Sequence, residues 1–128
     1  MSRQQRYDFI RDDSRRRVIV KAREPLDAAD LVAIVDRQIA EGAWRFGIVY
    51  DLRVAFAGAT SPEDGQTIAA YVLRQVAAHG PRGAVAIVTR QPDMIAAGLM
   101  YAYRARKVNV EVFWDIDEAE CWLDELTR

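Results

Sequence analysis

Apolar and polar residues follow one another along the chain in patterns that predict several short strands. Residues 7–10 and 18–22 are rich in aromatic and β-branched residues and flank the polar stretch 11–17, so they predict a β-hairpin. Residues 46–50 and 84–89 are nearly continuous apolar runs. Such runs are typical of strands that are buried on both faces of a largely parallel sheet.

The last predicted strand is apolar on one side only. Val108, Val110 and Val112 alternate with Asn109 and Glu111. This period of two predicts a half-exposed strand near the edge of the sheet.

Four further segments carry apolar residues at helical spacing, each behind a helix-start signal. The first begins at the capping residue Asp27 and ends at Gly42, and the second follows the capping residue Ser61. The third begins at Pro92, and the fourth is capped by Asp115. The predicted inward faces consist of Ala28, Leu31, Val32, Val35 and Ile39 in the first helix, Ile68, Val72 and Val76 in the second, Met94, Ile95, Leu99 and Tyr103 in the third, and Ala119, Trp122, Leu123 and Leu126 in the fourth.

These segments follow the order β-β-α-β-α-β-α-β-α within a single domain that spans residues 1–128. Strands that alternate with helices are joined by right-handed crossovers and lie parallel to one another. We therefore expect an α/β fold with a mixed, mostly parallel five-stranded sheet and four helices. The first strand should be antiparallel to its hairpin partner.

The charges of the chain nearly cancel, because 18 basic residues oppose 19 acidic ones and leave a formal net charge of -1. Such a protein has no long-range field that would gather nucleic acid or an anionic membrane, so we expect neither as a partner. One cysteine and one histidine exclude an internal disulfide and any zinc site rich in cysteine or histidine. Because glycine-rich phosphate loops are also missing, we expect no metal and no cofactor.

The chain also shows no targeting pattern. Its polar, basic start, residues 1–6, is not followed by the apolar stretch of a secretory signal. No run approaches the roughly 20 apolar residues that a membrane-spanning helix needs. Together with the lone cysteine, this predicts a cytoplasmic protein without a membrane span.

Candidate binding residues follow the predicted parallel strands. Open α/β sheets bind ligands beyond the carboxyl ends of such strands, and the second helix directs free backbone N–H groups to the same edge. In the alternative interpretation, Ser61 and Asp115 are only helix caps and Asp51 only ends a strand. The residues that we expect at this edge are Asp51, Arg53, Thr60, Ser61, Thr89, Arg90 and Asp115.

Three segments carry a resemblance to a known family, namely residues 43–53, 84–89 and 112–123. The last of them, a strand followed by an acidic cap and an Ala-x-x-Trp-Leu helix, is the most specific. The chain resembles the STAS domain of anti-sigma factor antagonists and sulphate transporters. More narrowly, it resembles the SpoIIAA-like bacterial proteins that are grouped with STAS and SEC14-type folds. The resemblance covers most of the chain and implies a regulatory domain that binds another protein.

The resemblance also draws attention to Ser61. In the antagonists, a phosphorylatable serine lies within an Asp-Ser-Ser-Gly sequence, ten residues past a strand-ending aspartate. Ser61 has this spacing from Asp51, but Ala59-Thr60-Ser61-Pro62 replaces the motif. Ser61 is therefore either a phosphoacceptor or a helix cap. We favour the cap, since a proline after the serine presents a stiffer chain to a kinase.

Other residues with reactive or charged side chains have simpler explanations. We expect Cys121 to be a packing residue and His79 to stabilise the C-terminal end of its helix. The basic run 15–17 lies in a predicted turn, where we expect it to be solvated. The aromatic and basic run 100–107 has the composition of a single-strand nucleic-acid contact, but we prefer Tyr103 in the core with the basic side chains in solvent.

No combination of acid, base and nucleophile emerges, so we predict a non-enzymatic regulatory or protein-interaction module. The alternative is a carrier of a small lipophilic or anionic ligand, based on the SEC14-type relationship and the small residues of the third helix. An enzyme of unknown class is the third hypothesis, in which Asp51 and Asp115 would work as a pair if burial shifted the pKa of one of them. We also expect a weak homodimer, because Trp44, Trp114 and Tyr101 are difficult to bury in one small core.

Overall fold

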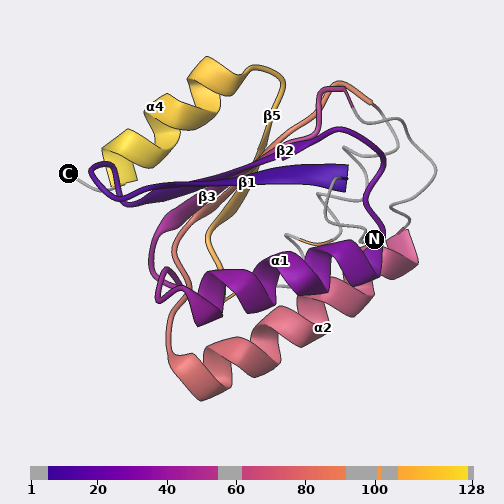
Figure 1. Ribbon diagram of the computed structural model, residues 1–128, viewed down its shortest axis with the longest axis vertical. Coiled ribbons are helices and arrows are strands. Elements are labelled where there is room, and N and C mark those ends of the chain that lie inside the picture. The colour runs from indigo at the N-terminus through magenta and orange to yellow at the C-terminus, as the bar shows by residue number, and fades with distance from the viewer. Residues whose placement is uncertain (1–5, 55–61, 92–100, 102–106, 127–128) are drawn as a thin grey trace.

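The computed structural model describes residues 6–54, 62–91, 101 and 107–126, and these form five strands and three helices (Figure 1). The strands are β1 (Tyr7–Asp12), β2 (Arg17–Ala22), β3 (Gly47–Asp51), β4 (Val85–Val88) and β5 (Val110–Phe113). The helices are α1 (Ala28–Ala40), α2 (Pro62–His79) and α4 (Ile116–Leu126). The helix that we predict from Pro92 lies outside the described residues, apart from Tyr101, which is helical.

All five strands form one sheet in the order β1-β2-β3-β4-β5. β1 is antiparallel to β2, and the neighbours from β2 to β5 are parallel, which confirms the predicted mixed sheet. The spatial order of the strands is their order along the chain, because each parallel connection after β2 joins strands that are neighbours in the sheet. β5 is therefore the last strand, at the sheet edge where its alternating residues place it.

Two layers of helices cover the sheet. α1 and α2 lie side by side on one face, and α4 lies on the opposite face over β3, β4 and β5 (Figure 1). In β3, Ile48 and Tyr50 join the core beneath α1 and α2, whereas Val49 packs with Ala119 and Leu123 of α4. Both faces of this strand are covered, which explains its nearly continuous apolar sequence.

The hairpin has longer strands and a shorter turn than predicted. β1 extends to Asp12 and β2 begins at Arg17, so the turn is confined to residues 13–16, where Arg16 N–H donates to Asp13 O at 3.1 Å. Arg16 has the positive φ of 51° that reverses the chain. The prediction of a solvated basic run is confirmed for Arg15 and Arg16 but is wrong for Arg17, which is 1% exposed. As the first residue of β2, Arg17 is directed toward acidic residues of α4.

The predicted start and end of α1 are both confirmed. Asp30 N–H donates to the Asp27 side chain at 2.9 Å, and Asp27 N–H donates to the Asp30 side chain at 3.0 Å. This reciprocal capping box satisfies two backbone donors that the helix itself leaves free. Gly42 lies just beyond the helix with a φ of 71°, a conformation that suits glycine.

The buried face of α1 differs in part from the predicted one. Of the predicted residues only Val35 is fully buried, and Ala28, Leu31, Val32 and Ile39 are partly exposed. The helix instead buries Ile34 together with the polar residues Asp30 and Gln38. These two can be buried because each has hydrogen-bond partners, Asp30 in the capping box and Gln38 with a buried arginine.

The inward faces of the other two helices largely follow the sequence pattern. In α2, Ile68 and Val72 are buried and Val76 packs against the core. In α4, Ala119 and Leu123 are buried and Trp122 is half-buried, but the last residue, Leu126, is 45% exposed, so its assignment to the core is wrong. None of the helices among the described residues is long and apolar enough to cross a membrane.

Candidate functional site

At the carboxyl end of β3, Asp51 and Arg53 form an ion pair. Asp51 is the last residue of the strand and is 5% exposed. Arg53 folds back onto it and donates from Nε to Oδ1 and from Nη2 to Oδ2, at 2.9 Å in both cases. The Arg53 backbone N–H also donates to Oδ1, at 3.2 Å. A tight turn after the strand thus fixes a bidentate pair, the strongest geometry for these two groups.

This pairing decides the protonation of Asp51. Burial acts to raise the pKa of Asp51, but the hydrogen bonds and charge of Arg53, with a smaller contribution from Lys21, outweigh it and hold the pKa below its ordinary value. The pKa of Arg53 is raised by its hydrogen bond to Asp51 and by the charges of Asp115 and Asp117. Asp51 therefore lacks the raised pKa that the enzyme hypothesis requires of a general acid.

Arg90, which follows β4, contacts Trp114, which follows β5. Arg90 Nε donates to the Trp114 carbonyl oxygen at 3.2 Å. The guanidinium carbon lies 5.7 Å from the centroid of the indole ring, in cation–π range. Trp114 is nevertheless 58% exposed. Arg90 thus contacts both the backbone and the ring of an exposed tryptophan.

Thr89 and Asp115 form backbone contacts at the same edge. Thr89 is fully buried, donates its N–H to Phe113 O at 3.0 Å, and accepts the backbone N–H of the second residue after it at its hydroxyl oxygen. Asp115 precedes α4, and its Oδ1 accepts from Asp117 N–H at 3.1 Å. The predicted capping role of Asp115 is therefore confirmed.

Most of the predicted site residues lie together at this edge. The charge of Asp115, which follows β5, acts on Arg53, which follows β3. Thr89, which follows β4, donates a hydrogen bond to the end of β5. Two of the predicted residues, Thr60 and Ser61, lie outside the described residues. Those that the structure places at the carboxyl ends of the strands or just beyond them are Asp51, Arg53, Thr89, Arg90 and Asp115. Their function as a binding site stays a prediction.

Sequence reasoning missed a shallow groove between the end of β5 and α4. It has a volume of about 560 Å³, and we call it the β5–α4 groove. The rings of Phe113 and Trp122, with centroids 5.5 Å apart, form its apolar part. The groove is lined by Phe113, Asp117, Glu118, Cys121, Trp122 and Glu125.

The prediction that Cys121 is a packing residue is wrong, because its thiol is free and exposed. Ala119 and Leu123 occupy the inward positions of α4, and a residue two positions from each of them points away from that face. Four of the groove residues on α4 have the helical spacing i, i+3, i+4 and i+7, namely Glu118, Cys121, Trp122 and Glu125. This second stripe was the available sequence signal for the groove.

A second unexpected feature is the buried guanidinium of Arg82, which is 7% exposed. It donates to Gln38 Oε1 from Nη2 at 2.8 Å and from Nε at 3.2 Å. It also donates to the hydroxyls of Tyr50 and Tyr101, each at 3.2 Å, and lies 5.2 Å from the ring centroid of Trp44. Within the part of the chain that the structure describes, no carboxylate forms an ion pair with it.

The guanidinium of Arg82 gives this buried cluster a positive charge. Burial lowers the pKa of Arg82, but its interactions with Tyr50 and Tyr101 outweigh that effect and raise the pKa. Burial raises the pKa of Tyr101 to about 12, so its hydroxyl stays protonated at neutral pH. Trp44 and Tyr101 are each 6% exposed, so the expectation that they are difficult to bury is wrong. Of the three aromatic residues behind the homodimer prediction, only Trp114 is exposed.

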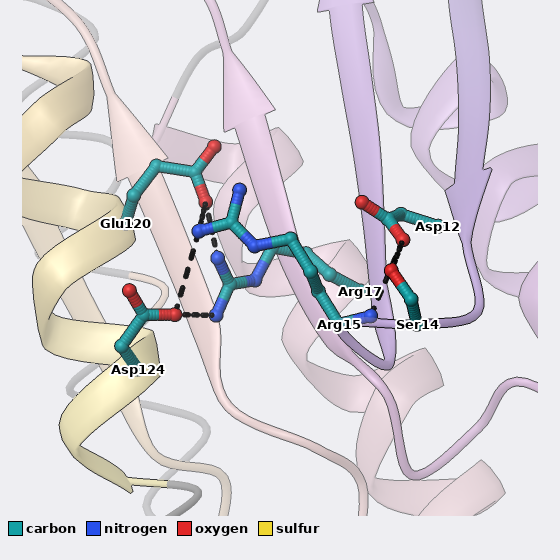
Figure 2. Close-up of polar contacts among 6 residues, drawn as sticks. All are labelled: Asp12, Ser14, Arg15, Arg17, Glu120 and Asp124. Atoms are coloured by element: carbon teal, nitrogen blue, oxygen red, sulfur yellow. Dashed lines mark hydrogen bonds and ion pairs between the residues drawn. The ribbon is translucent and has the colours of Figure 1, made fainter.

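Figure 2 shows another buried arginine, Arg17 of β2, reaching the acidic side chains of α4. Arg17 pairs with Glu120 and, at 2.8 Å, with Asp124. Arg15 approaches the same two carboxylates at 3.9 and 3.5 Å. The pKa of Asp124 is lowered, chiefly by its hydrogen bond from Arg17. The cluster ties α4 to β2 in addition to the three strands on which the helix packs.

Among the described residues, no group of three or more histidine, cysteine, aspartate or glutamate side chains is arranged to hold a metal ion. Comparison with known proteins adds no relative, since no protein-family model, no curated protein and no solved structure matches the chain.

Proposed function

We propose that the chain is a non-enzymatic, STAS-like protein-interaction module that recognises its partner through the carboxyl edge of the sheet and the adjoining start of α4. The observation that carries this proposal is Trp114, a residue that is 58% exposed and whose ring lies within cation–π range of Arg90. The resemblance to STAS and SpoIIAA-like domains points to the same class of function.

An exposed tryptophan offers a large apolar surface to a partner. Covering about 100 Å² of its apolar surface would contribute about 2.5 kcal/mol to an association. Tryptophan and arginine are also the residues most enriched among those that dominate protein–protein binding energies. Because Arg90 already restrains Trp114, less conformational entropy is lost when a partner covers the ring.

The surroundings of Trp114 also have the composition of a protein interface. Val54, at the same sheet edge, is 57% exposed. Arg53 and Arg90 supply positive charge, and Asp115 and Asp117 supply negative charge beside the apolar groups. A mixed polar rim around exposed apolar groups is typical of protein recognition. The nearby β5–α4 groove is open and shallow, which favours a protein surface over the enclosed pocket of a small-ligand carrier.

The proposal is tested by affinity capture from the native cell with the full chain as bait. We expect a protein partner that is recovered in a stoichiometric amount and that rebinds the purified chain. Trp114→Ala should weaken this rebinding about tenfold or more. Ile10→Ala is the matched control, because Ile10 is also an exposed apolar residue, at 48%, but lies on β1 at the opposite end of the sheet.

Two results would contradict the proposal. One is a partner that binds wild type and Trp114→Ala equally well while both proteins are folded by circular dichroism. The other is repeated capture without any stoichiometric protein, together with a native mass spectrum that shows a retained small molecule. That second result would favour the carrier hypothesis.

A further inference from the structure

The flank of α4 that lines the β5–α4 groove carries a regular pattern of acidic and apolar residues. Of these residues, Trp122 also packs against the core beneath the helix. Ala119 and Leu123 point into the core, and Glu120 and Asp124 point toward Arg17 of β2. The remaining flank faces the β5–α4 groove. There, an acid, two apolar residues and a second acid follow one another at i, i+3, i+4 and i+7, namely Glu118, Cys121, Trp122 and Glu125.

The two acids of this stripe differ from those on the other flank of the helix. Glu120 and Asp124 are neutralised by the arginines of the hairpin. Glu118 and Glu125 are both exposed, and neither forms an ion pair with any residue in the described part of the chain. The groove therefore combines an aromatic pair with three acidic side chains that form no ion pair among the described residues, namely Asp117, Glu118 and Glu125. It complements a surface that is basic and apolar.

We propose that the β5–α4 groove receives an amphipathic helix of a partner protein, with two basic residues seven positions apart and apolar residues three and four positions after the first of them. This inference rests on the proposed interaction function and names the chemistry of its partner. The basic residues pair with Glu118 and Glu125, and the apolar residues pack on Phe113 and Trp122.

The spacing of the groove favours a helix as the occupant. Residues seven apart on α4 are separated by about 10 Å along its axis and lie on nearly the same side. A second helix alongside α4 repeats this distance with its own residues seven apart. It also places the residues three and four positions after the first over the aromatic pair. This is the helix-in-groove mode of recognition, in which anchors recur at i, i+3, i+4 and i+7.

The test uses an alanine-rich synthetic peptide of about 18 residues, long enough to form a helix, that carries this lysine–leucine pattern. It is added to the full chain labelled with ¹⁵N, and binding is followed by amide chemical shifts. We expect the shifts to concentrate at residues 113–125. A peptide with glutamate in place of the lysines should bind about tenfold more weakly or not at all.

Charge exchange provides the decisive comparison. Glu118→Lys combined with Glu125→Lys should abolish binding of the lysine peptide and create binding of the glutamate peptide. Glu24→Lys combined with Glu63→Lys is the matched control, because it changes the net charge equally at two exposed acids outside the groove and should leave lysine-peptide binding unchanged. Attaching a bulky maleimide to Cys121, the single cysteine of the chain, should block the peptide.

The inference is overturned if both peptides bind equally, if the shifts lie outside residues 113–125, or if the charge exchange has no effect. The two proposals can fail separately. A captured partner that depends on Trp114 but tolerates the double lysine exchange in the groove would overturn the helix proposal alone. The absence of any Trp114-dependent partner would overturn the proposed function itself.

Discussion

Arg82 shows how a single charged side chain can be buried without a counter-ion among the described residues. Its guanidinium donates to one amide oxygen and two phenol oxygens and stacks near Trp44, so each of its nitrogens has a partner. The neutral acceptors compensate in part for the hydration that the charge loses. Arg82 also joins α1, through Gln38, to β3, through Tyr50, which makes it a central residue of the core.

Arg82→Met should therefore destabilise the protein by about 3 kcal/mol, because it leaves the oxygen of Gln38 and two phenol groups without their donor. Arg82→Lys should also be less stable than wild type, because a lysine cannot reproduce the planar fork of donors. Urea unfolding followed by circular dichroism measures both variants. The control is Arg74→Met at an exposed arginine of α2, which should change stability by less than about 0.5 kcal/mol. An equally small effect at Arg82 would contradict the account.

Ser61 allows a prediction that rests on the sequence alone. If it caps α2, Ser61→Ala should cost about 1 kcal/mol, and Ser61→Asp should be nearly neutral because aspartate caps equally well. We expect this result, together with unchanged partner binding. The check is the intact mass of protein purified from its native cell. A large fraction that is heavier by about 80 Da and maps to Ser61 would instead identify a phosphorylation switch.

At the scale of elements, Gly83 fixes the approach of β4 to the chain segment before β3. Its N–H donates to Trp44 O at 3.0 Å. A Cβ atom at this position would overlap the carbonyl of Phe46 and lie 2.6 Å from that of Arg45. Both obstacles are backbone groups, which cannot rotate away as a side chain does.

Gly83→Ala should accordingly cost about 3 kcal/mol or more, or prevent folding, because β3 and β4 must move apart. Gly47→Ala is the informative comparison. There the added carbon meets the flexible end of Leu123 at 3.2 Å, so a smaller loss of about 1 kcal/mol is expected. Thermal unfolding of the two variants measures the difference. Equal losses would show that the backbone contact at Gly83 is not limiting.

The link between β2 and α4 should make stability depend on pH. In the folded protein the pKa of Asp124 lies below its ordinary value of 3.8, chiefly because Arg17 donates a hydrogen bond to it. A carboxyl with a lowered folded-state pKa stabilises the protein above its unfolded pKa, and this contribution is lost as the pH falls through the folded pKa. The contribution of Asp124 to wild-type stability should therefore begin to fall as the pH drops below about 5 and should be lost as the pH passes through the lowered folded-state pKa.

Asp124→Asn should flatten this decline, as measured by urea midpoints across the same pH range. Glu125→Gln, at the neighbouring residue that forms no ion pair among the described residues, should keep the wild-type slope. A slope that is identical in wild type and Asp124→Asn would contradict the assigned role of the ion pair.

Local signals accounted for the strands, their directions and the helix ends, because caps such as Asp27 and glycines such as Gly42 act within a few residues. Burial of polar residues could not be predicted in this way. Arg17 is buried because Asp124, 107 residues away, meets it across the fold, and Arg82 because Gln38, 44 residues away, does so. Neither partner can be identified before the sheet is assembled.

The candidate site was predictable to a similar extent. The carboxyl edge follows from topology, so Asp51 and Arg90 could be placed there from the order of elements. The difficulty of burying Trp114 was also predicted from its place at the end of an element, and this residue is 58% exposed. The exposure of Cys121 could not be predicted, because it depends on the rotation of α4 about its axis. That rotation is set by Ala119 and Leu123 packing on β3 and β4.

At the scale of the whole molecule, the two faces of the sheet have different roles. The face beneath α1 and α2 carries the larger core and the buried Arg82 cluster. The opposite face carries α4 alone among the described helices (Figure 1). The outer flank of α4 and the connection before it hold the exposed aromatic and acidic groups. The proposed recognition surface thus lies on the side of the molecule that contributes less to the core.

Hydrogen exchange of the full chain, alone and bound to its captured partner, tests the central claim most directly. The account predicts that exchange slows mainly at residues 113–122 and at Arg90, around Trp114 and the start of α4. Slower exchange confined to α1, α2 or β1, with residues 113–122 unchanged, would contradict it.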